Sequence, residues 1–323
     1  MYTNRYCIGV DLGGTNIAVG LVRLDTKNIV KQFSVKTNAP RSCESISEDI
    51  AEVSKKLCSQ EGIKLSDVEW IGIATPGIVK DDVVLVAFNL GWTNAEFGKI
   101  LSNITGRPTY VANDANAAAY AEAIWGSGQG AKSLIAFTLG TGVGGGIVID
   151  GKIWEGMNGF AAEMGHTILV PGGRSCSCGK RGCIEAYCSA TALIKETKRM
   201  MKNYPESLMW KEVNGDIERV SGKTAFRGKD EGDRCAELVV NEFVDSLAVG
   251  IENAINMFQP DVVCIGGGIS REGENLLAPL RERVLHGTFG IDGRRTKLVA
   301  AHFRNDAGII GAALLGLQYE IKK

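Results

Sequence analysis

The sequence predicts an α/β protein of two domains that share one architecture. Strand and helix patterns alternate along the chain, and a strand, a glycine-rich turn and a second strand open it. The same strand–turn–strand pattern returns at residues 133–153. A length of 323 residues agrees with two domains of roughly 150 residues each.

The first half of the chain begins with a predicted hairpin. Residues 6–12 (YCIGVDL) and 17–24 (IAVGLVRL) are apolar, β-rich runs separated by the turn GGTN, and residues 29–37 predict a third strand. Helical spacing of apolar residues predicts a helix over 44–61. A buried strand then ends in a Pro-Gly turn, and a further strand, PTYVAND, runs directly into the Ala-rich helix NAAAYAEAIWG.

The second half continues the alternation after the repeated hairpin. The expected elements are a helix at 235–258, a strand at 261–270, a helix at 274–285, a strand at 296–303 and a final helix at 306–320. We expect a smaller domain, residues 1–116, completed by a C-terminal helix within 304–323. Residues 117–303 form the larger domain, with a hinge near 113–117.

Composition excludes several classes of protein. Lys and Arg total 36 against 37 Asp and Glu, so the chain lacks the basic footprint of a nucleic-acid binder, and no helix-turn-helix segment precedes the first strand. No stretch reaches the roughly 18 apolar residues that a membrane span needs. The N-terminus has no signal-peptide pattern, which favours a cytosolic protein. Six scattered cysteines are then expected to be buried free thiols: Cys7, Cys43, Cys58, Cys188, Cys235 and Cys264.

Three glycine-rich turns follow predicted strands and are candidates for phosphate binding. They are DLGGTN (residues 11–16), LGTGVGGG (139–146) and IGGGIS (265–270). Glycine lets backbone N–H groups converge on an anion, although any single hairpin needs glycine for its turn alone. The G-x-G-x-x-G at 140–145 is not a dinucleotide fingerprint, because a strand rather than a helix follows it. A P-loop motif is absent from the sequence, so a nucleotide would bind to hairpins.

Asp114 lies where a predicted strand ends and a helix begins. Ligands of α/β proteins bind at the carboxyl ends of strands, so this carboxylate is a candidate general base for phosphoryl transfer. The alternative is that Asp114 only caps the helix. The adjacent Asn113 and the glycine-rich turns favour a functional role.

A cluster of three cysteines predicts a metal site. Cys176, Cys178 and Cys183 form C-x-C-x4-C, and His166 lies ten residues before the first of them. Three thiolates and an imidazole make a closed tetrahedral zinc site of the structural type, which leaves no open position for catalysis. The alternative is a chance cluster of free thiols. Glu163 and Glu185 flank the cluster at a spacing suited to sugar hydroxyls, and the second nitrogen of His166 is free to orient a substrate.

Four motifs together resemble the ROK family of repressors, open reading frames and sugar kinases. They are DLGGTN, NDANAAAYAE, LGTGVGGGI followed by EMGH, and CSCGKRGCIE, and the resemblance runs from Ile8 to the last helix. The family implies an actin-like ATPase (ribonuclease H-like) fold of two α/β domains with a sugar cleft between them. It also implies a cytosolic ATP-dependent hexose kinase and a homodimer.

The resemblance assigns a role to each motif residue. Asp114 would be the general base, and zinc would be held by His166, Cys176, Cys178 and Cys183. Sugar hydroxyls would be held by Asn113, Asp114, Glu163, His166 and Glu185. Mg²⁺ and ATP would be held near Asp11, Gly13, Gly14, Thr15, Asn16, Gly140, Thr141, Gly142, Gly266, Gly267 and Gly268.

Substrate preference is the least constrained part of the prediction. CIEAYCSATAL resembles the glucokinases of the family more than its N-acetylhexosamine kinases, which favours glucose. Ala162 stands where family members commonly have glycine, beside Glu163, and a methyl group there can shift the sugar. Fructose, mannose or an N-acetylhexosamine are the alternative substrates, and polyphosphate is the alternative donor. A sugar-sensing regulator is a further alternative, disfavoured because the first hairpin begins within ten residues of the start.

Overall fold

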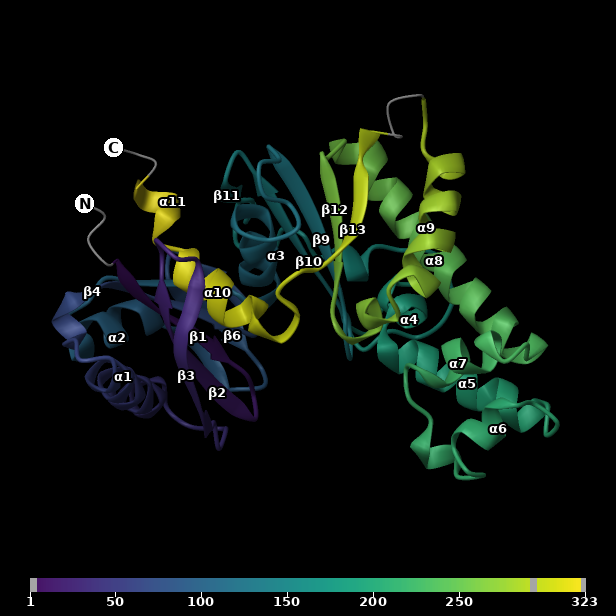
Figure 1. The fold of residues 1–323 in the computed structure, drawn as a ribbon, viewed down its shortest axis with the longest axis horizontal. Helices are drawn as coiled ribbons and strands as arrows, with labels where there is room; N and C mark the ends of the chain where they lie inside the picture. The colour runs from purple at the N-terminus through teal and green to yellow at the C-terminus, as the bar shows by residue number, and fades with distance from the viewer. Residues whose placement is uncertain (1–4, 291–294, 321–323) are drawn as a thin grey trace. The chain divides into compact units, whose positions relative to one another are not determined.

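The computed structural model of the chain describes residues 5–290 and 295–320 (Figure 1). The described residues divide into two compact units. Unit 1 takes those within 1–132, 146–162 and 302–323, and unit 2 takes those within 133–145 and 163–301. This division follows contacts within each unit and does not test the predicted domain boundaries near 116 and 303. These boundaries, and the hinge near 113–117, stay a prediction.

The main sheet of unit 1 has five strands in the order β3-β2-β1-β4-β8. β1 pairs antiparallel with β2 and parallel with β4, β2 pairs antiparallel with β3, and β4 pairs parallel with β8. The bounds are β1 Tyr6–Leu12, β2 Asn16–Arg23, β3 Asn28–Lys36, β4 Val68–Thr75 and β8 Thr109–Asn113. The predicted opening hairpin and third strand are therefore present.

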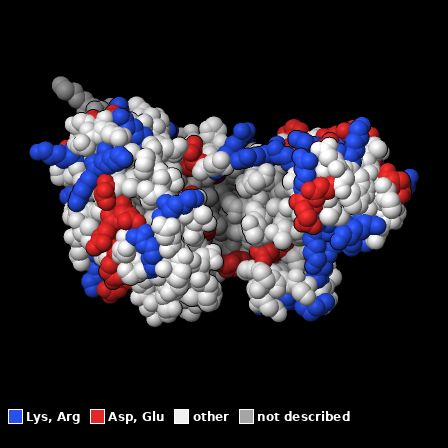
Figure 2. Space-filling model, turned by 90° about the horizontal axis from the view of Figure 1, so that it is seen from below, with Lys and Arg blue, Asp and Glu red and all other residues white. Residues whose placement is uncertain are grey.

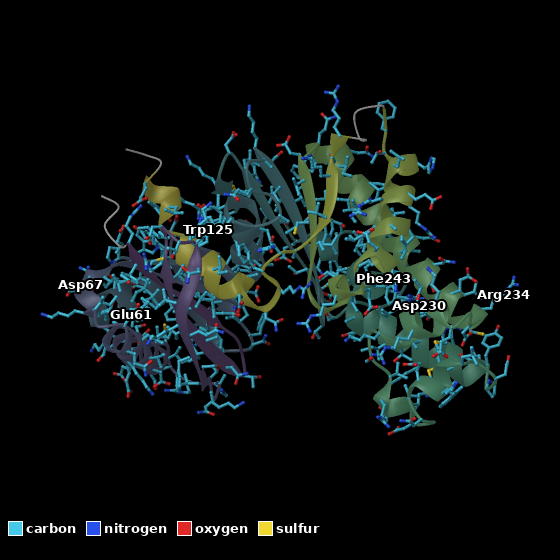
Figure 3. The ribbon with its side chains drawn as sticks, in the orientation of Figure 1. Glu61, Asp67, Trp125, Asp230, Arg234 and Phe243 are labelled. Carbon is cyan, nitrogen blue, oxygen red and sulfur yellow. The ribbon has the colours of Figure 1, made fainter. Side chains whose placement is uncertain are left out.

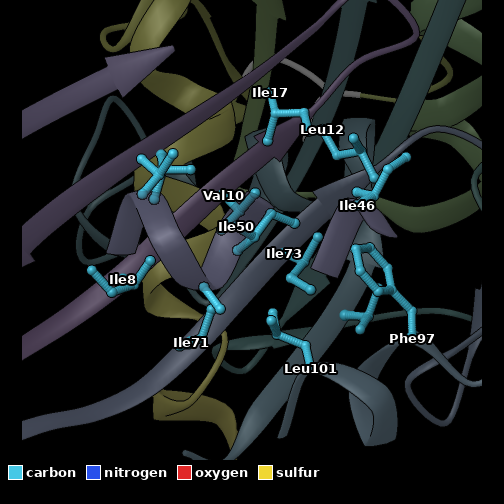
Figure 4. Packing of buried hydrophobic residues seen from close by; sticks show 14 of the residues in the cluster. Ile8, Val10, Leu12, Ile17, Ile46, Ile50, Ile71, Ile73, Phe97 and Leu101 are labelled. Carbon is cyan, nitrogen blue, oxygen red and sulfur yellow. The ribbon is translucent and has the colours of Figure 1, made fainter. Parts of the chain in front are cut away.

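The two faces of this sheet carry different side chains because successive residues of a strand point to opposite sides. On one face, Ile8, Val10 and Leu12 of β1 pack with buried residues of α1 (Cys43–Gln60) and α2 (Phe97–Thr105). Figure 4 shows Ile46 and Ile50 of α1 in this core. The other face alternates with it and carries the small residues Gly9, Gly72 and Ala74, against which α10 (Ala307–Leu314) packs.

The approach of α10 to the sheet depends on glycine. A Cβ added at Gly9 would overlap the carbonyl oxygen of Ile309, and one at Gly72 would overlap that of Ala312. On its far side α10 meets α3 (Asp114–Ile124), where a Cβ at Gly311 would overlap the carbonyl oxygen of Ala117. At these three glycines the backbone of α10 therefore meets the backbone of its neighbours directly, and small or aliphatic side chains such as Ala74, Ala312 and Ile309 fill the rest of the contact.

A small antiparallel sheet, which the sequence reasoning did not predict, follows β4. Its order is β5-β6-β7, with bounds Ile78–Lys80, Val83–Ala87 and Trp92–Ala95. Its turn residues Asp81 and Asp82 both have positive φ. Trp92 and Phe97 meet edge to face with ring centroids 5.1 Å apart, which joins β7 to the start of α2.

The second five-stranded sheet repeats the strand order of the first. Its order is β11-β10-β9-β12-β13, and β12 pairs parallel with both β9 and β13. The bounds are β9 Ser133–Leu139, β10 Val143–Ile149, β11 Lys152–Ile153, β12 Val262–Gly266 and β13 Lys297–Ala300. The similarity between the two hairpins in the sequence thus reflects two sheets of one design.

Helices make up most of the remainder of unit 2. Their bounds are α4 Glu185–Cys188, α5 Ala190–Asn203, α6 Met209–Glu212, α7 Thr224–Asp230, α8 Arg234–Phe258 and α9 Glu274–Gly287. Asp233 caps α8 by accepting hydrogen bonds from the backbone N–H groups of Cys235 and Ala236. Phe243 (Figure 3) and Leu247 belong to the apolar stripe of α8, which is buried at helical spacing.

The predicted final helix is interrupted. α10 ends at Leu314, and the short α11 runs over Leu317–Glu320. Gly316 lies so close to the indole of Trp70 that a Cβ would overlap the ring, while the Trp70 Nε1–H donates to the Ala313 carbonyl at 2.7 Å. This packing ends the helix at a point that helical periodicity alone does not indicate.

Replacing Gly72 with alanine should destabilise unit 1 by about 3 kcal/mol, because the new Cβ would overlap the backbone of α10 and neither partner can rotate away. Urea unfolding of the two proteins measures the difference. Gly14→Ala is the matched control, since its Cβ would meet Asn89 at an ordinary 3.5 Å. Equal unfolding midpoints for Gly72→Ala and Gly14→Ala would contradict the packing.

Candidate functional site

Two carboxylates predicted to be functional lie near each other in unit 1. Asp11 is the penultimate residue of β1, and Asp114 is the first residue of α3. Gly308, at the start of α10, leaves room for Asp11, because a Cβ there would crowd the carboxylate. The close packing of α10 against both β1 and α3 therefore sets the places of both acids.

Asn113, not Asp114, caps helix α3. The Asn113 Oδ1 accepts from the backbone N–H groups of Ala115 and Asn116 at 3.0 and 3.2 Å, and its Nδ2 donates to the Gly77 carbonyl at 2.8 Å. Asp114 Oδ1 accepts from the Ala115 N–H at 2.8 Å. Capping, the alternative role considered for Asp114, is thus performed by its neighbour.

The surroundings of both acids favour their protonated forms. Burial, and then the charge of Asp114, raises the pKa of Asp11 to about 6. The side chain of Asp114 is reached by solvent but is closely surrounded by protein. Desolvation therefore raises the pKa of Asp114, and the hydrogen bond from the Ala115 N–H opposes this rise.

The first glycine turn, DLGGTN, is exposed at residues 14–16, and hydrogen bonds from Thr37 hold it on one side. The Gly13 N–H donates to the Asn16 carbonyl at 2.9 Å, which closes the turn. Thr37, just past β3, donates its hydroxyl to the Gly13 carbonyl at 2.6 Å and its N–H to the Thr15 carbonyl at 2.9 Å. The sequence did not indicate a role for Thr37, because it belongs to no motif. Thr37 comes close to the turn because β3 pairs with β2, the strand that follows the turn.

The other two glycine turns are adjacent in unit 2. The Gly140 N–H donates to the Gly142 carbonyl at 3.0 Å, and the Thr191 hydroxyl donates to the Thr141 carbonyl at 2.8 Å. Gly267 has φ +82°, and a Cβ there would overlap the backbone of Leu139. The 265–270 turn therefore lies against the end of β9, where the 139–146 turn begins.

The predicted metal ligands come together in unit 2. The ligand atoms of His166, Cys176, Cys178 and Cys183 all lie within 4.8 Å of one another. The Cys178 and Cys183 sulfurs are 3.7 Å apart, and the Cys176 sulfur is 3.7 Å from the His166 Nδ1. A tetrahedron of thiolates at about 2.3 Å from zinc has edges of about 3.8 Å, so the group fits that ion.

The orientation of His166 leaves its second nitrogen available. Nδ1 faces the cysteines, and Nε2 lies 4.0 Å from the Glu163 Oε2. Glu163 precedes the single helical turn Met164–His166, and His166 is its last residue. Ala162 precedes it with φ +65°, a left-handed conformation that costs a residue with a Cβ about 1 kcal/mol. The glycine common at this position in the family would adopt it without that cost.

Glu185 connects the metal cluster to the second glycine turn. It begins α4, two residues after Cys183. Its Oε2 accepts from the Val143 N–H at 3.1 Å, and its Oε1 accepts from the Ser177 hydroxyl at 2.6 Å. Neither partner was a candidate in the sequence, although Ser177 lies between two predicted ligands.

The two sheets, the glycine turns and the carboxylates together define a class of protein. Two sheets of one strand order, each opened by a glycine-turn hairpin, are the actin-like ATPase fold, and the carboxylates and turns suit phosphoryl transfer. The chain belongs to the ROK family, whose model matches residues 7–319.

Individual relatives agree with the family assignment. The chain is 38% identical to the glucokinase of Thermotoga maritima over 309 residues, 95% of each chain. A crystal structure of a ROK glucokinase from Streptomyces griseus with glucose and AMPPNP has 36% identity and a TM-score of 0.79, covering 97% of this chain and 99% of that one. The ROK hexokinase of Thermus thermophilus has 32% identity and the same TM-score, covering 98% and 99%. No helix in the described part of the chain is long and apolar enough to cross a membrane.

The raised pKa of Asp11 predicts a pH-dependent stability. Between pH about 4, where an unfolded Asp titrates, and about 6, the folded protein binds the extra proton, so the free energy of unfolding falls as pH rises. Asp11→Asn should reduce this fall, leaving the part that comes from Asp114, and be more stable than wild type at pH 7 by about 2 kcal/mol. Urea unfolding at pH 4.5, 5.5 and 7, without Mg²⁺ or nucleotide, measures it. Parallel stability curves for the two proteins would exclude the effect.

Proposed function

We propose that this protein is an ATP-dependent hexose kinase that phosphorylates glucose to glucose 6-phosphate. The observation that carries the proposal is the Asp114 carboxylate at the first position of α3, with its capping role taken by Asn113. Similarity to glucokinases over nearly the full chain supports both the reaction and the sugar.

In this proposal Asp114 accepts the proton of the sugar hydroxyl that attacks the γ-phosphorus. A raised pKa makes its carboxylate a stronger base than an ordinary aspartate, which suits that task. Asn113 retains one amide hydrogen that neither Gly77 nor α3 uses, so it can donate to the sugar. Glu163, His166 through Nε2, and Glu185 hold further hydroxyls.

The nucleotide is proposed to bind at the glycine turns. The exposed Gly14, Thr15, Asn16 and Thr141 supply backbone and side-chain donors for phosphate oxygens. Gly13, Gly140 and Gly142 close the two turns through their own backbone hydrogen bonds, and Gly266–Gly268 contact the nucleoside. Asp11 would hold Mg²⁺, which neutralises charge on the phosphates when bound. A carboxylate whose pKa is raised to about 6 by desolvation and a neighbouring acid is well suited to gain a cation.

The metal cluster is proposed to hold a structural zinc ion. Its four protein ligands leave no open coordination position, so the metal orders the loop of residues 166–183 rather than taking part in the reaction. With Nδ1 of His166 bound to the metal, the neutral tautomer carries its proton on Nε2, and this N–H donates to a sugar oxygen.

Other parts of the proposal concern partners and location. Acidic and basic side chains are interspersed on the face seen in Figure 2, which supports a small-molecule rather than a nucleic-acid partner. All nine cysteines are free, which supports a reducing, cytosolic location. Family resemblance and the exposed Met257, Phe258 and Leu285 support a homodimer. Ala162, beside Glu163, is the residue by which sugar preference would depart from glucose.

Asp114→Asn should lower kcat by about 10²–10⁴-fold, because the amide cannot accept the proton. ADP release with Mg-ATP across a panel of hexoses measures it, with glucose expected as the best substrate. The control is Asp81→Asn, an exposed turn aspartate of unit 1. Near-normal turnover by folded Asp114→Asn would reject the general base. Turnover on another hexose would reject glucose alone, and no turnover with ATP but activity with polyphosphate would reject the donor.

Cys178→Ser should lose most of its bound zinc and bind glucose more weakly, because the loop that carries His166 and Glu185 loses a ligand. Metal analysis of the purified protein and glucose titration measure the two effects. Cys235→Ser is the control, since Cys235 lies at the start of α8 and outside the cluster. A full equivalent of zinc in Cys178→Ser would contradict the assigned ligand set.

A further inference from the structure

We propose that Ser177 is a positioning residue for sugar recognition, acting through Glu185. The inference rests on the proposed function, in which the Glu185 carboxylate holds sugar hydroxyls. It concerns how this chain fixes that carboxylate. A glutamate side chain has three rotatable bonds, so a particular carboxylate position needs restraints.

The Glu185 carboxylate is held at both oxygens. The Ser177 hydroxyl donates to Oε1 at 2.6 Å, and the Val143 backbone N–H donates to Oε2 at 3.1 Å. The first donor belongs to the loop of metal ligands, and the second begins β10, directly after the 140–142 turn. The carboxylate therefore joins two segments of unit 2 that each have a proposed role of their own.

Gly142 restricts the same carboxylate sterically. A Cβ at Gly142 would overlap the Glu185 Oε2, and its three nearest atoms outside the adjoining residues all belong to this carboxylate. The φ of Gly142 is not in the left-handed region, so its backbone conformation does not require glycine. Absence of a side chain at Gly142 is what lets the carboxylate lie over the turn and reach the Val143 N–H.

Ser177 is the stronger of two side-chain donors at Oε1. The Cys176 sulfur lies 3.4 Å from this oxygen, and a thiol is a weak hydrogen-bond donor. The Ser177 hydroxyl lies 2.6 Å from the same oxygen, a distance typical of a strong hydrogen bond from a hydroxyl to a carboxylate. The Ser177 hydroxyl therefore supplies most of the side-chain restraint on Oε1.

The two restraints leave capacity for a ligand. An ionised carboxylate has about four lone-pair sites, of which Ser177 and Val143 use one each. The remaining sites can accept two hydroxyls from a sugar at a geometry fixed in advance. Preorganisation of this kind lowers the entropy lost on binding, so its removal should weaken sugar affinity more than it slows turnover.

The test compares Ser177→Ala with Ser177→Thr, which keeps the hydroxyl, and with Ser175→Ala as matched control. Ser175 lies in the same loop, but its hydroxyl accepts from Arg181 and does not contact Glu185. The readouts are the glucose Kd by calorimetry, KM for glucose and for ATP, kcat, and zinc content. Ser177→Ala should raise the glucose Kd and KM about threefold to tenfold, with KM for ATP and zinc content unchanged. Ser177→Thr should restore them, and Ser175→Ala should behave as wild type.

Glu185→Gln separates failure of this inference from failure of the proposed function. If Glu185→Gln weakens glucose binding and Ser177→Ala does not, the positioning role is overturned while the sugar-binding role of Glu185 stands. If Glu185→Gln binds glucose normally, the assigned sugar contact fails and the positioning role fails with it. A loss of zinc in Ser177→Ala, with kcat and both KM values changed together, would show a structural role in the loop and would also overturn the inference.

Discussion

The seating of α10 on the sheet of unit 1 is the contact on which the arrangement of this unit depends. Gly9 and Gly72 on the sheet side, and Gly311 facing α3, let backbone approach backbone at three points of the two interfaces. Backbone atoms then set the spacing, and backbone cannot change its rotamer to accommodate an error. The helix fixes β1, which carries Asp11, and α3, which carries Asp114, against one rigid element. The placement of the two acids is thus a consequence of packing between glycines.

The second unit orders its functional groups differently. Its loop from His166 to Cys183 has little regular structure, and the ligand cluster supplies the restraint that a hydrophobic core supplies elsewhere. Glu185 follows the last ligand by two residues, so ordering of the cluster is passed to this carboxylate along a very short stretch of chain. One unit therefore positions its groups by close packing, and the other by coordination and hydrogen bonds.

Local spacing made much of this predictable. The cysteine cluster could be found because its ligands are near one another in the chain, and the hairpins because alternation and glycine turns are short-range patterns. The seating of α10 could not be found, since Gly72 and Ala312 are 240 positions apart and small residues alone do not identify a partner. Asn and Asp are both favoured N-cap residues, so the sequence does not indicate which of Asn113 and Asp114 caps α3. The choice depends on how the backbone passes from β8 into the helix. The positive φ of Ala162 is a backbone conformation that alanine disfavours, so the sequence does not predict it and the surrounding fold imposes it.

The discontinuity of unit 1 has a consequence for protein synthesis. Residues 302–323 belong to unit 1 and leave the ribosome after every residue of unit 2. Until α10 emerges, the sheet face with Gly9, Gly72 and Trp70 lacks its covering helix, while unit 2 already has all of its segments. The nascent chain therefore completes the later unit first and the earlier unit last. A ribosome that stalls before codon 307 leaves a chain with an open apolar sheet, a natural binding surface for a chaperone and a site of aggregation without one.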